Sequence, residues 1–416
     1  MKKRMIVIGA VVIGTLWGMA STSVLADSDP LVGRWDMTIL YPDNPRISWL
    51  GVEKKDGKYV GLLLREGGSP GKVGEVKLEG SIVKWEWRRG KQFLSFTGTL
   101  KDGKMEGVRV DHEDNKVKWT ANRFVRKLNV TGKWKIEFKA GEKTRTNILL
   151  LKQQGDQIIG KMLRGKGKGR GIDIADAQLK NDILTFSATF TGKGDKTRTM
   201  SYKVKVKGDV LEGAAANKQG REFKLSGQRE RKWGEPIELF NGKELDGWKP
   251  MGSSRDNKWK VIDGIMTNTG HGANIVCNRK FQDFKLHVEF KVPEHSNSGV
   301  YLRGRYEIQV EDTYGKKLTH NICGAPYGRI TPTQNAAKKA GEWQTFDITL
   351  IDSYLTLVHN GIKTVDNQEL VGITGGAIDS DEAAPGPIYL QGDHGAIYYR
   401  KITITPAEPP AVPEGL

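Results

Sequence analysis

One stretch, NSGVYLRGRYEIQVEDTYG (297–315), carries charged side chains at a spacing that suits catalysis. Side chains of a β-strand alternate between its two faces. The apolar face predicted in this way consists of Val300, Leu302, Tyr306, Ile308 and Val310. The polar face consists of Arg303, Arg305, Glu307, Gln309 and Glu311. A carboxylate among cations can remove a proton while a cation stabilises the charge that develops. The alternative is a solvated face with weak ion pairs.

The spacing of the two glutamates limits the chemistry of this face. Glu307 and Glu311 are four residues apart, which separates their backbones by about 13 Å at a rise of about 3.3 Å per residue. Glycosidases that use two carboxylates hold them about 5–5.5 Å or about 6.5–9.5 Å apart. The pattern therefore favours one base, Glu307, flanked by Arg305 and Gln309, with Arg303 further along. Asp312 falls on the other face or in the turn that follows.

A second candidate lies in the turn QGDHG, where His394 follows Gln391 and Asp393. Histidine titrates near neutrality and suits proton transfer or metal ligation. His271 and His320 stand in Gly- or Asn-flanked segments and are predicted to be loop residues. No motif has zinc-ligand spacing and none requires a cofactor. A calcium site remains possible, and the acidic segment DSDEAAPG (379–386) could supply its oxygens or form a solvated loop.

The first half of the chain is an internal repeat of about 100 residues, 27–126 and 127–230. VGRW (32–35) returns as TGKW (131–134), and KKDGKYVGLLL (54–64) as KQQGDQIIGKML (152–163). Short alternating runs separated by DG, GD or ND predict antiparallel strands with tight turns. Each copy is therefore expected to be a small β-barrel or sandwich. Trp35 and Trp134 open the first strand of each copy and are predicted to plug the core rather than stack on a ligand.

Basic charge is concentrated in the second repeat. Residues 127–232 hold 25 Lys and Arg against 11 Asp and Glu, a net charge of +14, with the densest cluster at KGKGRG (166–171). This cluster carries no aromatic residue for base stacking, so nucleic acid is not an expected partner. The repeat could attract an acidic polysaccharide or an anionic surface, and the cluster itself could equally be a solvated loop.

The N-terminal segment has the features of a secretory signal peptide. MKKR precedes an apolar run and STSVLA, which predicts cleavage after Ala26 and a periplasmic or extracellular protein. The alternative is an uncleaved anchor, and no later segment is apolar enough to span a membrane. The two cysteines, Cys277 and Cys323, could form a disulfide or remain buried thiols.

The second half of the chain carries several ordered blocks that resemble one family. They include ELFNGKELDGW (238–248), FQDFKLHVEFKV (281–292), the opening stretch, GAPYGRITPTQNAAKKAGEWQTFDI (324–348) and GPIYLQGDHGAIYYRKITI (386–404). Over residues 235–405 the chain resembles the 3-keto-disaccharide hydrolase domain family. The resemblance implies an all-β concanavalin A-like jelly roll that acts on glycosides with a ketone at C3. One segment, 334–343, could form a helical turn, and 406–416 is a Pro-rich tail.

The chemistry that this resemblance implies gives roles to the candidate residues. A C3 ketone acidifies the hydrogen on C2, so Glu307 could remove it as a base while Arg303 stabilises the enolate and His394 assists the leaving group. Water then adds, and the net reaction is hydrolysis by a hydrolase or lyase. Candidate substrate-binding residues are Arg305, Gln309, Asp312, Asn297, Tyr327, Gln391 and Asp393. Because a fold does not fix function, the alternative is a non-catalytic, lectin-like carbohydrate-binding protein.

Overall fold

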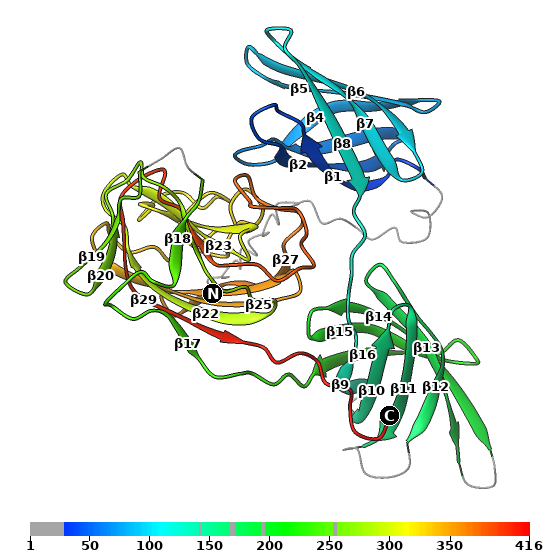
Figure 1. Ribbon diagram of the computed structural model, residues 1–416. Helices are drawn as coiled ribbons and strands as arrows, with labels where there is room; N and C mark the ends of the chain where they lie inside the picture. The colour runs from blue at the N-terminus through cyan, green and yellow to red at the C-terminus, as the bar shows by residue number, and fades with distance from the viewer. Residues whose placement is uncertain (1–28, 141–142, 166–170, 193–195, 253–255) are drawn as a thin grey trace, which may run out of the picture.

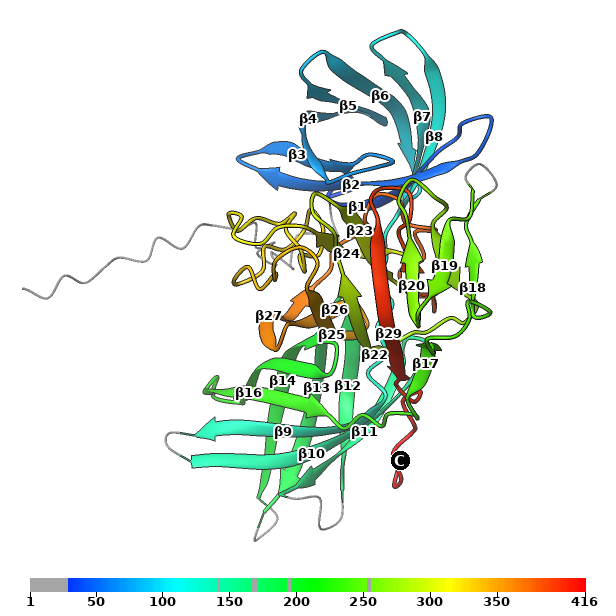
Figure 2. The ribbon, with the colours of Figure 1, turned by 90° about the vertical axis from the view of Figure 1, so that its left-hand side faces the viewer.

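The computed structural model describes residues 29–140, 143–165, 171–192, 196–252 and 256–416. The predicted signal peptide and most of KGKGRG lie outside these residues. The described residues form strands and loops without a helix, and so include no helix that could cross a membrane. Three β domains follow one another along the chain, and the C-terminal domain lies between the other two (Figures 1 and 2). The predicted all-β fold is confirmed.

The first domain is a closed barrel in which every strand pairs with its neighbour in sequence and β1 pairs with β8. Its tight turns use Asp-Gly pairs at positive φ, such as Asp56–Gly57 (49° and 79°), as the sequence predicts. The strands are β1 (Gly33–Ile39), β2 (Arg46–Lys55), β3 (Lys58–Leu64), β4 (Gly71–Glu79), β5 (Ile82–Arg89), β6 (Gln92–Lys101), β7 (Lys104–Asp111) and β8 (Lys116–Arg123).

The second domain repeats this barrel. Its strands are β9 (Gly132–Ala140), β10 (Lys143–Gln154), β11 (Gln157–Arg164), β12 (Ile172–Lys180), β13 (Ile183–Thr191), β14 (Thr197–Lys207), β15 (Val210–Asn217) and β16 (Glu222–Arg229). Trp35 and Trp134 are fully buried, and each indole donates to a carbonyl four residues earlier at 2.9 Å. Arg123 and Arg229 stack on these indoles at 4.5 and 4.3 Å. The same tryptophan–arginine plug therefore closes one end of each barrel, which confirms the predicted core role of the tryptophans.

The third domain is a sandwich of two antiparallel sheets around one large core. The larger sheet has the order β19 (Trp259–Ile262), β20 (Ile265–Asn268), β29 (Ile397–Pro406), β22 (Phe284–Lys291), β25 (Trp343–Ile351), β26 (Tyr354–His359) and β27 (Ile362–Glu369), with β17 (Ile237–Phe240) also paired to β29. The smaller sheet has the order β18 (Trp248–Pro250), β21 (Ile275–Cys277), β28 (Tyr389–Leu390), β23 (Asn297–Leu302) and β24 (Tyr306–Glu311).

The structure corrects one feature of the opening stretch. Residues 300–311 do not form one strand: the chain reverses at Arg303 and Gly304, whose φ angles are 52° and 67°, and β24 returns beside β23. The predicted apolar face nevertheless lies in the core, because the turn preserves the alternation. Cys277 and Cys323 are buried free thiols, so the alternative of a disulfide is wrong. Residues 334–343 contain no helical turn.

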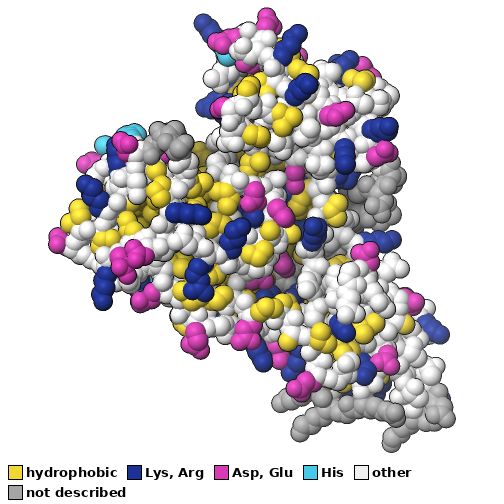
Figure 3. Space-filling view, viewed as in Figure 1, with side chains coloured by type: hydrophobic (Ala, Val, Ile, Leu, Met, Phe, Trp, Pro, Cys, Tyr) yellow, Lys and Arg dark blue, Asp and Glu magenta, His cyan; other side chains and the backbone are white. Residues whose placement is uncertain are grey.

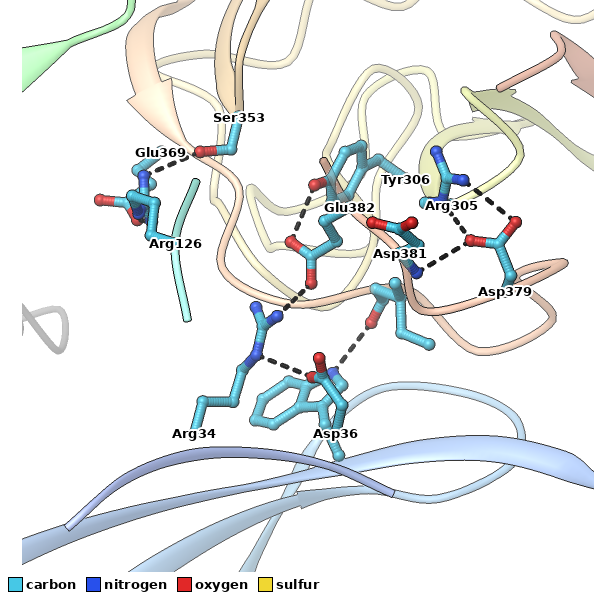
Figure 4. A network of polar contacts seen from close by, with 12 residues as sticks. Arg34, Asp36, Arg126, Arg305, Tyr306, Ser353, Glu369, Asp379, Asp381 and Glu382 are labelled. Atoms are coloured by element: carbon cyan, nitrogen blue, oxygen red, sulfur yellow. Dashed lines mark hydrogen bonds and ion pairs between the residues drawn. The ribbon is translucent and has the colours of Figure 1, made fainter. Parts of the chain in front are cut away.

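Both barrels contact the sandwich. From the first barrel, Arg34 on β1 pairs with Glu382 at 2.6 Å, and Glu382 also accepts a hydrogen bond from Tyr306 at 2.8 Å (Figure 4). From the end of the second barrel, Arg231 pairs with Asp283 at 3.0 Å. On the face seen in Figure 3, Lys and Arg alternate with Asp and Glu rather than forming one basic surface.

Candidate active site

The candidate site lies on the outer face of the smaller sheet. The register places Glu307 on β24 opposite Tyr301 on β23, and Tyr301 opposite Tyr389 on β28. The two tyrosine rings stack with their centroids 4.2 Å apart. Since alternate residues point to opposite faces, these three side chains form one row across three strands, turned away from the core.

Glu307 is held in this row by several contacts. Its Oε2 lies 3.0 Å from the Tyr301 hydroxyl, which also lies 2.7 Å from the Gly375 carbonyl. Its backbone N–H donates to Thr374 Oγ1 at 3.2 Å. A Cβ added to Gly299 would come within 2.6 Å of Glu307 Oε1, so this neighbour must be glycine for the carboxylate to keep its position. The carboxylate is thus fixed in one orientation.

Burial controls the ionisation of Glu307, which is only 5% exposed. Desolvation, the largest cause, raises its pKa to about 8, and the charge of Asp393 acts in the same direction. The hydrogen bond from Tyr301 and the charges of His394 and Arg329 act against this rise. A carboxylate with a pKa near neutrality binds a proton far more strongly than an exposed one. Glu307 can therefore act as a general base on a weakly acidic carbon.

Arg329 is a site residue that the sequence reasoning missed. Its side chain is partly buried, and desolvation lowers its pKa to about 9 while Glu382 and Glu307 act in the opposite direction. Its Nη2 donates to the Ile373 carbonyl, but its Nε and Nη1 have no partner among the described residues. A buried guanidinium with free donors near Glu307 is suited to binding an oxyanion. Arg329 lies within a block that the family resemblance covers, which was the available signal.

A second row of the same face carries two unpartnered acceptors. Gln391 lies beside Gly299, to whose carbonyl its N–H donates at 2.9 Å, and Gly299 lies opposite Gln309. The Oε1 atoms of both glutamines are buried without a partner among the described residues, while Gln309 Nε2 donates to Glu311 at 3.2 Å. Buried acceptors of this kind are costly unless a ligand satisfies them, and hydroxyl groups would do so.

The turn after β28 brings the predicted histidine to this face. His394 Nδ1 lies 2.8 Å from Asp393 Oδ1, and the imidazole is half exposed. The charges of both residues act on the pKa of Glu307. Asn297 joins the turn to β23, because its carbonyl accepts a hydrogen bond from Gly395 N–H at 2.7 Å. The structure therefore brings Glu307, Gln309, Gln391, Asp393, His394 and Asn297 to one region.

Of the other candidates, Arg303 and Arg305 are engaged away from this region. Arg303 is fully buried, donates to the Asp352 carbonyl and lines a separate pocket of about 530 Å³ between the first barrel and the sandwich. Arg305 forms a two-point ion pair with Asp379 at 2.6 and 3.0 Å. Asp312 accepts a hydrogen bond from His295 N–H, and Tyr327 contacts Glu307 through its backbone N–H, at 3.0 Å to the Glu307 carbonyl.

The acidic segment 379–386 is partly exposed, and two of its carboxylates are engaged in ion pairs. Asp379 pairs with Arg305, and Glu382 pairs with Arg34 of the first barrel (Figure 4). Within the described ranges no three His, Cys, Asp or Glu side chains gather as a metal site would require. Two carboxylates of this segment, those of Asp379 and Glu382, therefore already bind guanidinium groups.

The first barrel supports the loop that holds Glu307. Trp49 on β2 donates from its indole to the Ile373 carbonyl at 3.0 Å, and the Arg329 guanidinium lies 5.0 Å from its ring centroid. Trp49 and Ile373 share a small buried apolar cluster. The next two residues, Thr374 and Gly375, are those that contact Glu307 and Tyr301. The barrel therefore fixes both the cation and the loop.

Comparison with known proteins finds a family match for the C-terminal domain. Residues 235–405 match the model of a family described as the 3-keto-alpha-glucoside-1,2-lyase-like domain. The chain is 28% identical over 110 residues to a 3-keto-disaccharide hydrolase of Bacteroides thetaiotaomicron, a match that covers 24% of this chain and 38% of that protein. It thus spans less than half of that relative.

Solved structures give weaker matches. A proposed glycosyl hydrolase from Parabacteroides distasonis matches at 28% identity with a TM-score of 0.36, covering 42% of this chain and 90% of that one. A β-agarase A matches at 11% identity with a TM-score of 0.26, covering 39% and 84%.

Proposed function

We propose that this protein cleaves glycosides whose sugar carries a ketone at C3, because residues 235–405 match the model of the 3-keto-alpha-glucoside-1,2-lyase-like domain family. The observation that carries the proposal is Glu307, a buried carboxylate with its pKa raised to about 8, beside a guanidinium with free donors. Export, which the N-terminal sequence predicts, is part of the same proposal.

The reaction would proceed by elimination. The Glu307 carboxylate removes the hydrogen from C2, and the electrons of the C2–H bond move to give an enolate at the C3 oxygen. The free N–H groups of Arg329 stabilise that oxygen, a role that the sequence alone had suggested for Arg303. The enolate then expels the C1 substituent, whose oxygen takes a proton from His394.

Hydrolysis is completed by water. The elimination leaves an enone with a C1–C2 double bond, and water enters as the leaving group departs, so the proton on Glu307 exchanges with solvent. Water then adds at C1 and gives its released proton back to His394, while C2 takes a proton from Glu307. The net change is cleavage of the C1–O bond by one water molecule. The unpartnered Oε1 atoms of Gln309 and Gln391 would accept hydrogen bonds from sugar hydroxyls during these steps.

The lectin-like alternative requires no such base. A protein that only binds sugar gains nothing from a carboxylate held in a place that disfavours its charge, because neutral amides make the same hydrogen bonds. Sites that perturb pKa values in this way are more typical of catalysis.

The test uses a 3-keto-disaccharide and the same disaccharide with a C3 hydroxyl group. The proposal expects cleavage of the ketone only, and loss of at least about 100-fold in kcat for Glu307→Gln with binding retained. Glu311→Gln, on the same face of β24, is the matched control and should keep its activity. Binding of the ketone without any cleavage by the wild-type protein would instead establish the lectin-like function.

A further inference from the structure

The open end of the second barrel contains a ring of inward-facing arginines. Arg145 on β10 lies opposite the inward-facing Phe138, and Arg198 on β14 lies opposite Phe190. Arg164 on β11 has the same parity as the core residue Met162, and so points inward too. Arg221, next to β16, is four residues before the core residue Leu225 and therefore lies on the same, inward face. The four arginines therefore stand on different sides of one barrel mouth.

This mouth is a pocket of about 1150 Å³. All four arginines line it together with Lys196, and the described residues of its lining include no Asp or Glu. Like charges gathered without a counter-charge repel one another and favour binding of an anion. The excess basic charge of this repeat is thus partly directed into a pocket rather than spread over an outer surface.

Aromatic rings form the wall beneath the arginines. Arg164 lies over Phe190 with 4.9 Å to the ring centroid, and Arg221 lies over Phe223 at 5.4 Å. Deeper in the barrel, Tyr202 stacks on Phe186 and closes the floor, with centroids 4.4 Å apart. The pocket therefore offers aromatic surface at its wall and charged donors at its rim.

The interior residues of the first barrel differ from those of the second at two equivalent positions. The cross-strand pairs Trp85–Phe96 and Phe186–Tyr202 are equivalent in the two copies. Two residues further along β5, Trp87 is buried in the first barrel, whereas Ala188 occupies the corresponding place on β13.

A second exchange has the same effect. In the first barrel, Arg109 is buried and is neutralised by Glu66. In the second barrel, the equivalent position in the pairing of β15 with β16 is Ala215. The second barrel therefore holds alanine at two interior positions where the first barrel holds large side chains, and the Arg109–Glu66 pair belongs to the first barrel alone.

The pocket faces away from the sandwich. The plugged end of the second barrel carries Asp209 and Arg231, and Arg231 pairs with Asp283 of the sandwich. Gly208 at that same end lies against Ile351. Because the plug and the mouth are at opposite ends of one barrel, a ligand can reach the mouth while the domains remain docked.

We propose that this mouth binds an acidic oligosaccharide, one whose sugar rings carry carboxylate or sulfate groups. Guanidinium groups pair with such oxyanions through two parallel hydrogen bonds. Aromatic rings provide flat apolar surface for the faces of sugar rings. A fatty acid has one charged end and would use one side of the mouth, whereas arginines on four sides, with Asn147 and Asn217 between them, suit a ligand that is polar all round.

The test is binding of trigalacturonate to the full chain, with a sulfated and a neutral oligosaccharide of equal length as further ligands. We expect trigalacturonate or the sulfated ligand to bind and the neutral one to fail. Arg198→Glu should weaken binding at least tenfold, and Lys203→Glu, an equal charge change on the outer face of the same strand, should change it less than twofold. Equal losses in both variants would overturn the proposal, as would binding of laurate but of neither acidic saccharide.

A second variant tests the pocket without a change of charge and with a check that the protein is folded. Ala188→Trp introduces the residue type of the first barrel next to Met200, which lines the pocket, without altering the net charge. If this variant retains its β circular dichroism and loses trigalacturonate binding, the pocket is the site; unchanged binding would contradict it. Cleavage of a small 3-keto-disaccharide at Glu307 should continue in all these variants, so this proposal and the proposed activity can fail separately.

Discussion

Replacing Glu307 by Gln should stabilise the C-terminal domain, and by more as the pH rises. A carboxyl group whose pKa is higher in the folded state than in the unfolded state favours folding while it is protonated. That contribution is present below the unfolded pKa and is lost as the pH rises through the folded pKa. For Glu307 the two values are about 8 and 4.5, so the window is pH 4.5 to 8. Glutamine is isosteric and never ionises.

The linkage relation gives the size of the effect. With these two pKa values, the wild-type carboxyl group lowers the free energy of unfolding relative to Gln by about 1 kcal/mol at pH 5.5 and by about 4 kcal/mol at pH 8. The increase of about 3 kcal/mol between the two pH values is the quantity to measure. Glu311→Gln, a partly exposed carboxylate paired with Lys316, should change stability by less than about 0.5 kcal/mol at either pH.

Hydrogen exchange of the β23 and β24 amides measures this difference within the correct domain. At each pH the intrinsic exchange rates are the same for both proteins, so the ratio of their protection factors gives the change in opening free energy. If the advantage of Glu307→Gln is the same at pH 5.5 and pH 8, then Glu307 ionises as an ordinary exposed carboxylate and the reasoning about its basicity is refuted.

Three further substitutions test the supports of the site. Trp49→Ala should lower kcat/KM at least tenfold, because it frees Arg329 and the Ile373 loop. Trp343→Ala, on the outer face of the larger sheet, should not lower it. Equal effects of the two substitutions would show that the first barrel does not support the site. Gly299→Ala should abolish cleavage, because its Cβ would lie 2.6 Å from Glu307 Oε1, and full activity would show that the carboxylate has room to move. Asp379→Ala should destabilise the protein by about 1.5–3 kcal/mol in urea unfolding, since it leaves the buried Arg305 with the Ala384 carbonyl alone. The exposed Asp366 pairs with Lys363, so Asp366→Ala should cost less than about 1 kcal/mol, and similar values for both aspartates would contradict the distinction.

The β architecture, and the side of its strand on which Glu307 lies, could be predicted from the sequence because both depend on local pattern. Alternation over 306–311 is a property of a single strand, and the Asp-Gly turns of the barrels follow from the backbone preferences of those residues. The turn at Arg303–Gly304 was not predicted, since arginine at positive φ is uncommon and nothing local marks it. That turn separates Arg303 and Arg305 from Glu307.

The remaining parts of the site depend on contacts that no local pattern shows. Arg329 lies in a loop without periodicity, and only the folded chain places it near Glu307. The hydrogen bond from Trp49 to Ile373 joins residues 324 positions apart. Docking of the first barrel therefore could not be derived from the spacing of either segment, although both segments were visible in the sequence.

If Glu307 removes the hydrogen on C2, cleavage of a 3-keto-disaccharide in D2O should reveal it. The released 3-keto-sugar should carry deuterium at C2, above the level found after incubation of the same sugar without protein. Glu307→Gln should give neither cleavage nor deuterium. Cleavage in D2O that leaves the original hydrogen on C2 would contradict the elimination and the role of Glu307 in it.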